Sequence, residues 1–346
     1  MLSYLHRALH VLRVAVSAPL QLFLTTKLPY NGRTLEGKLC VISGGTSGIG
    51  LATAEEMVKR GCDVILLVRD TKKCANVVSQ LSHLNDLFFG ARKSSVRAIE
   101  CELTSLASVR MCVSKLKELV KGRQIDYFCC TAAVFLKDDA IINSTHNHEL
   151  HYSVNHLGHF ALLEGLLELL RASQSRIVML TSDLMVLQDD CSTLGTPKSP
   201  RLTIYSPAEL GPLQLWRSLK DFASSRLASF AIFEELHARY PELSCVAVHP
   251  PYTGDVAYTG ALGTIFALLK ELVLVSHNHA CQSVLHCLLR PDVVPRGTFY
   301  HSCFGALPKN ILTLPPCLLS VVFRKNIWDQ TSRECLLGVE AGAMLR

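Results

Sequence analysis

The sequence has few charged residues and no dense run of basic ones. Only 18% of its 346 residues are Asp, Glu, Lys or Arg, and the 35 lysines and arginines are dispersed along the chain. Nucleic-acid-binding proteins concentrate basic residues in a patch or stripe, so this distribution argues against a nucleic-acid partner. The net charge of +6 instead suits an anionic cofactor or an anionic lipid surface.

The sequence also lacks the cysteine spacing of metal sites. None of its 14 cysteines belongs to a CxxC pair, so we expect buried, reduced thiols. Five histidines lie between His146 and His159, but they have no cysteine or carboxylate partners at the spacing of a closed zinc site. We therefore predict no metal site and interpret these histidines as part of a polar loop and helix face.

No apolar run reaches the roughly 20 residues that a helix needs to cross a bilayer. The segment Val14–Thr26 has 13 uncharged residues, interrupted by Pro19 and Gln21. A signal-peptide core, a monotopic anchor and an arm packed on the domain are all open interpretations, and the lack of an A-x-A-like cleavage site favours a retained anchor. Two further oily runs, Val256–Val275 and Ile311–Phe323, are more typical of core helices than of membrane contact.

From residue 37 onward, apolar runs rich in β-branched residues alternate with amphipathic helical patterns. This alternation predicts one α/β domain over residues 37–338, with a Rossmann-type doubly wound parallel sheet of about seven strands. Residues 1–36 are a hydrophobic N-terminal segment, and 339–346 a C-terminal tail. The Pro/Ser/Leu-rich stretch Asp183–Ser218 predicts a surface excursion near the mouth of the site. The expected strands are Leu39–Ser43, Asp63–Val68, Val96–Glu102, Ile125–Cys130, Arg176–Ser182, Ser244–His249 and Thr298–Tyr300.

A glycine motif closes the first expected strand and opens a helix. Gly44 would allow a tight turn, Gly48 a close approach of the backbone to a pyrophosphate, and Gly50 close packing of helix and strand. The start of the following helix would then offer free N–H groups to the phosphates. This context predicts a dinucleotide site. Its other expected contacts are Ser43, Thr46, Ser47 and Ile49.

The second expected strand ends at Val68-Arg69-Asp70, the position that reads the adenosine ribose in such folds. A guanidinium there pairs with the 2′-phosphate of NADP(H), whereas a carboxylate binds the 2′-hydroxyl of NAD(H). Because Arg69 comes first, we predict NADP(H) by preference over NAD(H). In the alternative, Asp70 takes the hydroxyl and Arg69 points to solvent.

These glycines, together with Tyr152–Phe160 and Arg176–Ser182, resemble the short-chain dehydrogenase/reductase family. Thr131–Phe135 and Asn326–Asp329 are similar to its retinol-dehydrogenase-like and WW-domain-containing-oxidoreductase-like branch. The resemblance covers roughly residues 37–338. It implies oxidoreductase chemistry with a nicotinamide dinucleotide, and cofactor contacts by four further residues, which are Glu102, Ala132, Arg226 and Pro250.

The resemblance also assigns the catalytic positions, and half of them are changed. Asn155 and Ser182 match the family's asparagine and serine, but Phe222 stands where its tyrosine belongs and Arg226 where its lysine belongs. No tyrosine in the chain has a lysine four residues later. Phenylalanine has no proton to exchange, so the family's usual mechanism is not available. Pro251 also replaces a glycine close to the expected nicotinamide.

Two functions remain open from sequence, and with them whether the chain is an enzyme at all. One is an NADP(H)-binding pseudoenzyme with a scaffold or regulatory role. The other is an active NADP(H)-dependent oxidoreductase in lipid metabolism, acting on a lipophilic alcohol or carbonyl such as a retinoid, steroid or polyprenoid. An anchored chain would lie on the cytoplasmic face of a membrane, such as the endoplasmic reticulum or a lipid droplet, and otherwise in the cytoplasm. Oligomerisation is left open.

Overall fold

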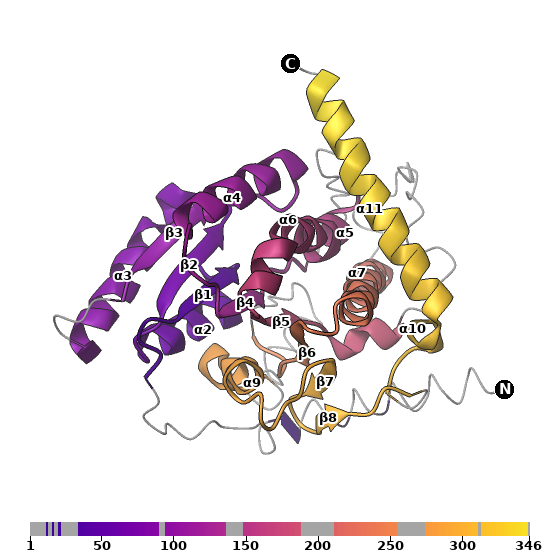
Figure 1. The fold of residues 1–346 in the computed structure, drawn as a ribbon. Coiled ribbons are helices and arrows are strands. Elements are labelled where there is room, and N and C mark those ends of the chain that lie inside the picture. Colours follow the sequence, from indigo (N-terminus) through magenta and orange to yellow (C-terminus); the bar gives the residue numbers. More distant parts are fainter. Residues whose placement is uncertain are drawn as a thin grey trace.

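The computed structural model describes residues 12, 16, 20–21, 34–89, 94–135, 148–187, 211–254, 274–310 and 313–344. A central sheet lies between two layers of helices (Figure 1). It has eight strands in the order β3-β2-β1-β4-β5-β6-β7-β8. The strands are β1 (Leu39–Ser43), β2 (Asp63–Val68), β3 (Val96–Glu100), β4 (Tyr127–Cys130), β5 (Arg176–Leu180), β6 (Ser244–His249), β7 (Thr298–His301) and β8 (Gly305–Leu307).

The first seven strands are parallel, and the chain changes its direction of travel across the sheet between β1 and β4. This order is that of the doubly wound fold, so the predicted Rossmann-type sheet is confirmed. All seven expected strands occur, with ends that differ by at most two residues. The expectation of a wholly parallel sheet was incomplete, because β8 pairs antiparallel with β7. Three residues are too few to show the alternating pattern of a strand.

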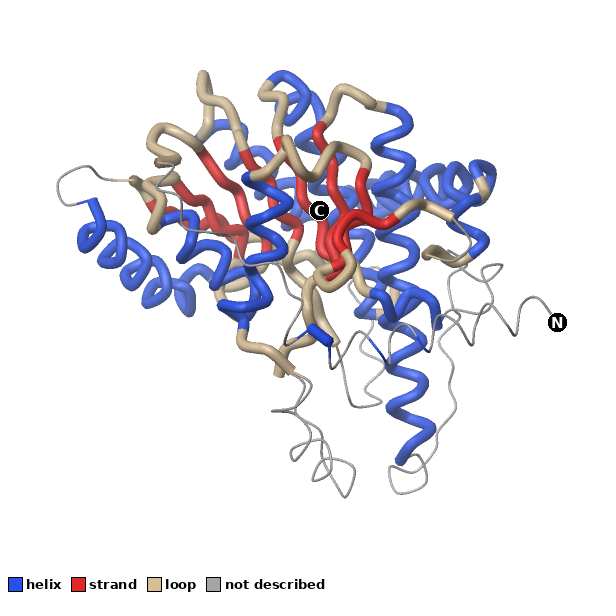
Figure 2. Tube along the Cα trace, turned by 90° about the horizontal axis from the view of Figure 1, so that it is seen from below, coloured by secondary structure: helices blue, strands red, loops and turns tan. Residues whose placement is uncertain are grey.

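Helices cover both faces of the sheet (Figure 2). One apolar core lies under α2 (Gly48–Val58), α3 (Thr71–Phe89) and α9 (His277–Leu289). The other lies under α4 (Leu106–Leu119), α6 (Gly158–Ala172), α7 (Gly211–Arg239) and α11 (Val321–Met344). The sequence of β1 is continuously apolar because both faces of this strand are buried. Ile42 belongs to the first core and its neighbour Val41 to the second. Shorter helical elements are α5 (Leu150–Tyr152), the π-helix η1 (Ser153–Leu157), the 3₁₀ helix η2 (Asp183–Leu187) and α10 (Pro316–Leu319).

The structure tests the predicted core helix for only one of the two oily runs. Ile311–Phe323 is not one core helix: the chain forms α10, breaks at Ser320 and begins α11, with Leu318 buried and Val322 exposed. Val256–Val275 falls almost entirely outside the described residues, as does most of the excursion after Leu187. In the part of the chain that the structure describes, no helix has both the length and the apolar character of a membrane span.

Cysteines and histidines follow the expectations only in part. Among the residues that the structure describes, twelve cysteines are free thiols, all of them buried except Cys303. Cys317 departs from the prediction, because it is disulfide-bonded. The polar-face interpretation is wrong for His151, His156 and His159, which are all buried. His156 shares a hydrogen bond with Thr331, and this bond ties η1 to α11.

Candidate dinucleotide-binding and catalytic site

The glycine motif forms a tight turn between β1 and α2. Gly44 has a φ of +73° and Gly48 a φ of +57°, a region that favours glycine. A Cβ atom on Gly44 would lie 2.6 Å from the Cα of Ala132, in the segment after β4. A Cβ on Gly50 would collide with the carbonyl oxygen of Gly44. The two glycines therefore let the loop, the helix and the neighbouring strand end pack together.

The first turn of α2 is open to an anion. Ser47 precedes the helix in an extended conformation, and its side chain makes no capping hydrogen bond. The first N–H groups of a helix have no partners within the helix, and its N-terminus carries a partial positive charge. The turn can therefore receive phosphate oxygens through backbone N–H groups.

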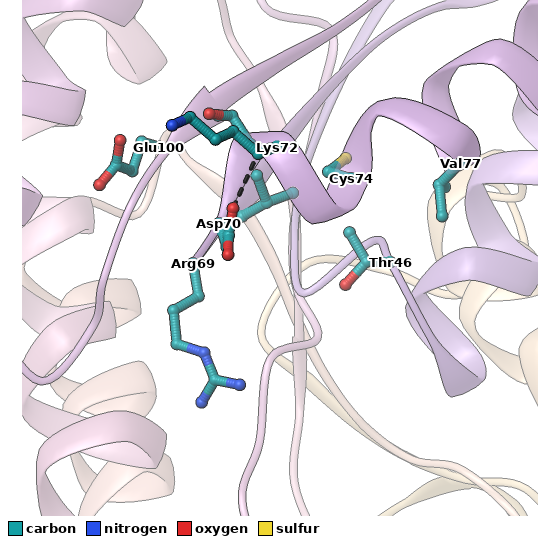
Figure 3. A pocket seen from close by; sticks show the side chains of 9 residues that line it. Thr46, Arg69, Asp70, Lys72, Cys74, Val77 and Glu100 are labelled. Carbon is teal, nitrogen blue, oxygen red and sulfur yellow. Dashed lines mark hydrogen bonds between the residues drawn. The ribbon is translucent and has the colours of Figure 1, made fainter.

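Beside this loop lies a cavity of about 650 Å³ (Figure 3). It is bounded by the glycine loop, the carboxyl ends of β2 and β3 and the start of α3. Thr46 and Arg69 are predicted contacts among its lining residues, and Asp70 is the alternative one. The residues from β3 and the first turns of α3 were not predicted, because they come close to the glycine loop only in the folded sheet. The lining residues are Thr46, Val68, Arg69, Asp70, Thr71, Lys72, Cys74, Val77 and Glu100.

Arg69 and Asp70 lie differently in this cavity. The side chain of Arg69 is 80% exposed, and its Nε lies 4.0 Å from an Oε of Glu102. The Oδ1 of Asp70 accepts a hydrogen bond of 3.0 Å from the backbone N–H of Lys72, at the start of α3. In Figure 3 the guanidinium of Arg69 extends away from Lys72. One carboxylate oxygen of Asp70 is thus engaged by the backbone, while Arg69 extends into solvent.

Asn155 and Ser182 occupy protected positions farther along the carboxyl edge. The amide of Asn155 exchanges two hydrogen bonds with the backbone of Val134, at 2.9 and 3.1 Å, and donates a third to Ser225 at 3.0 Å. It thereby joins the segment after β4 to α7. Ser182 follows β5, is largely buried, and accepts a hydrogen bond from the N–H of Leu184 at 3.2 Å.

Phe222 and Arg226 pack together one helical turn apart on α7. The guanidinium of Arg226 is buried and donates to the carbonyl oxygen of Leu180 at 3.0 Å. Burial lowers its pKa to about 10, so it stays charged near neutral pH. Phe222 makes an edge-on ring contact with Phe135, with centroids 5.4 Å apart. The two side chains fill the space beside Asn155 with an aromatic ring and a fixed cation.

Comparisons with known proteins agree with this geometry. A family model described as short chain dehydrogenase matches residues 38–221, which is more than half of the chain. The chain belongs to the short-chain dehydrogenase family. Its match to this family confirms the resemblance seen in the sequence motifs.

Two relatives illustrate the family match, and one solved structure illustrates the shared fold. The chain is 27% identical over 319 residues to WW domain-containing oxidoreductase of Danio rerio, covering 88% of this chain and 69% of that protein. It is 26% identical over 274 residues to retinol dehydrogenase 12 of Mus musculus, covering 78% and 79%. An alcohol dehydrogenase from the archaeon Thermococcus sibiricus, solved with 5-hydroxy-NADP, has the same fold, with a TM-score of 0.52 and 18% identity over 73% of this chain and 90% of that one.

Two predicted cofactor contacts of this short-chain dehydrogenase, Ser43 and Pro250, lie in different surroundings. Ser43 is buried, and its Oγ accepts from the N–H groups of Thr131 and Ala132 at 3.2 and 3.3 Å and lies 2.9 Å from Nε2 of His159. Its side chain therefore connects the end of β1 to the segment after β4. Pro250 is buried directly after β6. The strand order reverses between β1 and β4, which is the switch point of the sheet, and Pro250 lies on the other side of it from the cavity lined by Arg69, here called the Arg69 cavity. These contacts stay predictions.

A half-buried glutamate and a buried imidazole lie in contact beside Phe222, and this pair was missed from sequence. An Oε of Glu149 lies 2.6 Å from Nδ1 of His151, and the ring of His151 contacts the ring of Phe222 with centroids 6.1 Å apart. Burial raises the pKa of Glu149, but the hydrogen bond and charge of His151 outweigh it, so this pKa is lowered. Glu149 also caps α5 through two backbone N–H groups. The Glu-x-His spacing before a helix was the available signal.

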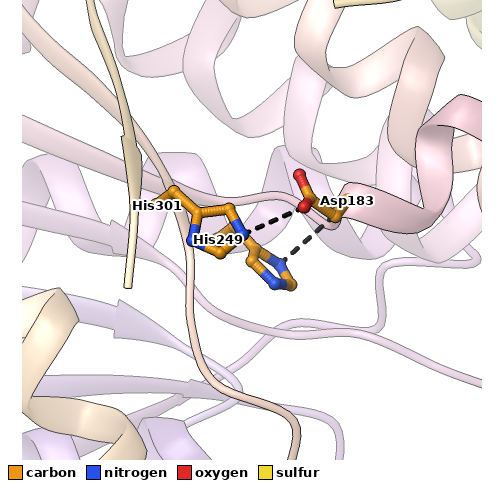
Figure 4. Close-up of side chains that lie close together, drawn as sticks. All are labelled: Asp183, His249 and His301. Atoms are coloured by element: carbon orange, nitrogen blue, oxygen red, sulfur yellow. Dashed lines mark hydrogen bonds and ion pairs between the residues drawn. The ribbon is translucent and has the colours of Figure 1, made fainter. Parts of the chain in front are cut away.

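A second buried cluster joins the ends of β5, β6 and β7 (Figure 4). Nε2 of His301 lies 2.9 Å from a carboxylate oxygen of Asp183, and the N–H of Asp183 donates to Nδ1 of His249 at 3.2 Å. The N–H of Cys303 donates to Nδ1 of His301 at 3.1 Å. Sequence spacing could not show this cluster, because its members come from three strand ends.

The hydrogen bonds in this cluster argue for a closed network rather than a metal centre. Both Nδ1 atoms accept backbone N–H groups, so the proton of each neutral ring lies on Nε2. A metal-bound imidazole has the opposite arrangement, with one nitrogen on the ion and the other donating outward. Asp183 is completely buried. The absence of a metal site stays a prediction.

Proposed function

We propose that this short-chain dehydrogenase binds NADP(H) but has lost the family's tyrosine–lysine proton step, and acts as a scaffold or regulatory protein. One observation carries the proposal: the tyrosine position holds Phe222, packed against the buried guanidinium of Arg226. Bound NADPH would supply a hydride. Reduction of a carbonyl by hydride leaves an alkoxide that needs a proton, and Phe222 has none to give.

Arg226 does not replace the missing donor. Its buried guanidinium donates to the carbonyl oxygen of Leu180, and an arginine side chain does not give up its proton in proteins. A positioned general acid contributes about 10²- to 10⁴-fold to a rate, so its loss is expected to reduce turnover by a similar factor.

Preference for NADP(H) is supported by the two residues at the end of β2. Arg69 is extended and exposed, and its contact with Glu102 is long at 4.0 Å, whereas one carboxylate oxygen of Asp70 is held by the start of α3. A guanidinium is therefore available to a 2′-phosphate at this place, while one oxygen of the carboxylate that would accept from a ribose hydroxyl already has a partner. The solved relative with 5-hydroxy-NADP supports the same class of cofactor.

The test pairs binding with turnover. Calorimetry of the full chain with NADPH is expected to give saturable binding at one site. NADPH oxidation with retinal, a steroid ketone or a simple aldehyde is expected to stay at the uncatalysed rate. Appreciable turnover that survives Ser182→Ala and Asp183→Ala would contradict the impaired site.

The second candidate is an active reductase for a lipophilic carbonyl, and the Glu149–His151 pair favours it. The ring of His151, whose Nδ1 lies against Glu149, could supply a proton to the substrate oxygen through Nε2, and bound NADPH would supply the hydride that turns the carbonyl into an alcohol. The rings of Phe135 and Phe222 would suit an apolar substrate. Turnover that is abolished by His151→Gln would select this candidate.

We also propose that the N-terminal segment attaches the chain to the cytoplasmic face of a membrane. Leu12 and Val16 are helical, four residues apart, and 59% and 42% exposed. Residues at this spacing share a helix face, so an apolar stripe is available to a bilayer surface.

A further inference from the structure

A glutamine of the N-terminal segment is built into the loop that follows β6. Gln21 is only 1% exposed, and its side-chain oxygen accepts a hydrogen bond of 2.6 Å from the N–H of Tyr252. Its side-chain N–H₂ donates to the carbonyl oxygen of the same residue at 3.3 Å. The amide thus pairs with both backbone groups of Tyr252, as a neighbouring strand would, across 231 residues of sequence.

The loop that Gln21 holds lies beside the catalytic serine position. Leu180 of β5 is paired with Val248 of β6, so the residues two places later, Ser182 and Pro250, leave the sheet next to each other. The ring of Tyr252 contacts His249 edge-on, with centroids 5.1 Å apart. Gln21 is therefore connected through Tyr252 and His249 to the segment that carries Ser182.

The two prolines explain why the loop depends on an outside partner. Pro250 and Pro251 have no backbone N–H, so the first N–H after β6 that can fix the loop is that of Tyr252. That N–H goes to Gln21. On its other side the loop is held by Val275, whose N–H donates to the carbonyl oxygen of Tyr252 at 3.0 Å. Without Gln21 the loop would lose both hydrogen bonds that tie Tyr252 to the N-terminal segment and would keep the one from Val275.

Dinucleotides bind across the switch point of a doubly wound sheet, with the two halves on opposite sides. The Arg69 cavity lies at the β2 and β3 ends, so the nicotinamide half would extend over the ends of β4, β5 and β6. We propose that Gln21 is a positioning residue for this nicotinamide half, because it sets the position of the Pro251–Tyr252 backbone. This inference rests on the proposed NADP(H) site, and makes the N-terminal segment part of that site.

The affinities of two ligands distinguish an effect on the nicotinamide half of the site from an effect on the adenosine half. 2′,5′-ADP contains the adenosine and its 2′-phosphate but no nicotinamide, whereas NADPH contains both halves. In calorimetry on the full chain, Gln21→Met keeps a side chain of similar size and removes both hydrogen bonds. We expect about five- to tenfold weaker NADPH binding, the size of one or two hydrogen bonds, and unchanged 2′,5′-ADP binding. A purely structural loss would weaken both ligands together.

Gln21→Glu gives a second measurement if the methionine variant folds poorly. Its carboxylate still accepts from the N–H of Tyr252 but faces the carbonyl oxygen without a donor, so NADPH should again weaken selectively. Gln282→Met is the control, because the amide of Gln282 donates within its own helix, α9. Equal NADPH affinity in wild type and both Gln21 variants would overturn the inference, as would equal weakening of both ligands. Wild-type protein that binds 2′,5′-ADP no less tightly than NADPH would also overturn it, whereas binding of neither ligand would overturn the proposed function itself.

Discussion

The guanidinium carbon of Arg226 lies over the ring of Phe222, 5.1 Å from its centroid. This is the geometry of a cation–π contact, which stabilises by roughly 0.5–2 kcal/mol. The two departures from the family's tyrosine–lysine pair are therefore in contact with each other. Changing one without the other would leave a cation or a ring without its partner.

Restoring both positions together should restore chemistry. We expect Phe222→Tyr with Arg226→Lys to raise NADPH-dependent reduction of retinal or a simple aldehyde by about 10²- to 10⁴-fold over wild type, because the pair returns a proton donor and the cation that lowers its pKa. Arg226→Lys alone should have little effect, because it returns no proton donor. The assay is NADPH absorbance under saturating cofactor.

Pro251→Gly belongs in the same series, because a proline in this loop can keep the nicotinamide from its position even when the donor is present. No gain in the triple variant, with NADPH binding intact, would show that the impairment does not lie in these three residues.

Arg69→Ala should remove the preference for NADP(H). A charge-assisted hydrogen bond to a 2′-phosphate is worth about 1.5–3 kcal/mol, so NADPH affinity should fall about 10- to 100-fold while NADH affinity stays unchanged. Calorimetry with both dinucleotides measures this. Arg97→Ala is the control, since Arg97 is exposed on β3 and outside the cavity lining. Wild-type protein with equal affinity for both dinucleotides would refute the assignment of Arg69.

Deletion of residues 1–30 should move the chain from the membrane pellet to the soluble fraction, because it removes Val14–Thr26. Fractionation of cells that express the full and shortened chains is the measurement. A shortened chain that stays in the pellet would transfer the anchor role to Val256–Val275 or Ile311–Phe323. The shortened chain also lacks Gln21, so its NADPH affinity is not a measure of location.

Stability should fall on mild acidification because of two buried histidines. Burial, together with the charge of Arg226, lowers the pKa of His159 to about 4, and burial lowers that of His156 to about 3, from an ordinary value of 6.5. Between about pH 6.5 and 4 the unfolded chain therefore binds more protons than the folded one, so the free energy of unfolding decreases as the pH falls.

His159→Gln should reduce this loss by about 3 kcal/mol, the equivalent of its pKa shift. Urea unfolding from neutral to acidic pH measures it, and the comparison is between slopes, because the variant also changes the contact with Ser43. The exposed His83→Gln should keep the wild-type slope. An unchanged slope in His159→Gln would mean that this ring is not buried in its neutral form.

The sequence predicted the elements whose signals are local. Gly44, Gly48 and Gly50 mark a strand–turn–helix unit, and seven apolar runs mark seven strands, because each pattern lies within a few neighbouring residues. What it missed depends on distant residues meeting in space. Asp183, His249 and His301 come from three strand ends, and Gln21 meets Tyr252 across most of the chain. Glu149 and His151 are an intermediate case, since their spacing was visible but their place beside Phe222 was not.

The two outer strands bear on how copies of this chain could associate. β8 is only three residues long, and it covers the side of β7 that would otherwise be open. At the opposite margin, β3 exposes the charged side chains of Arg97 and Glu100. Short and charged edge strands are poor templates for strand addition and for aggregation through the backbone. A second copy would therefore have to pack through helices, and a partly unfolded molecule that has shed β8 would be the form most prone to aggregate.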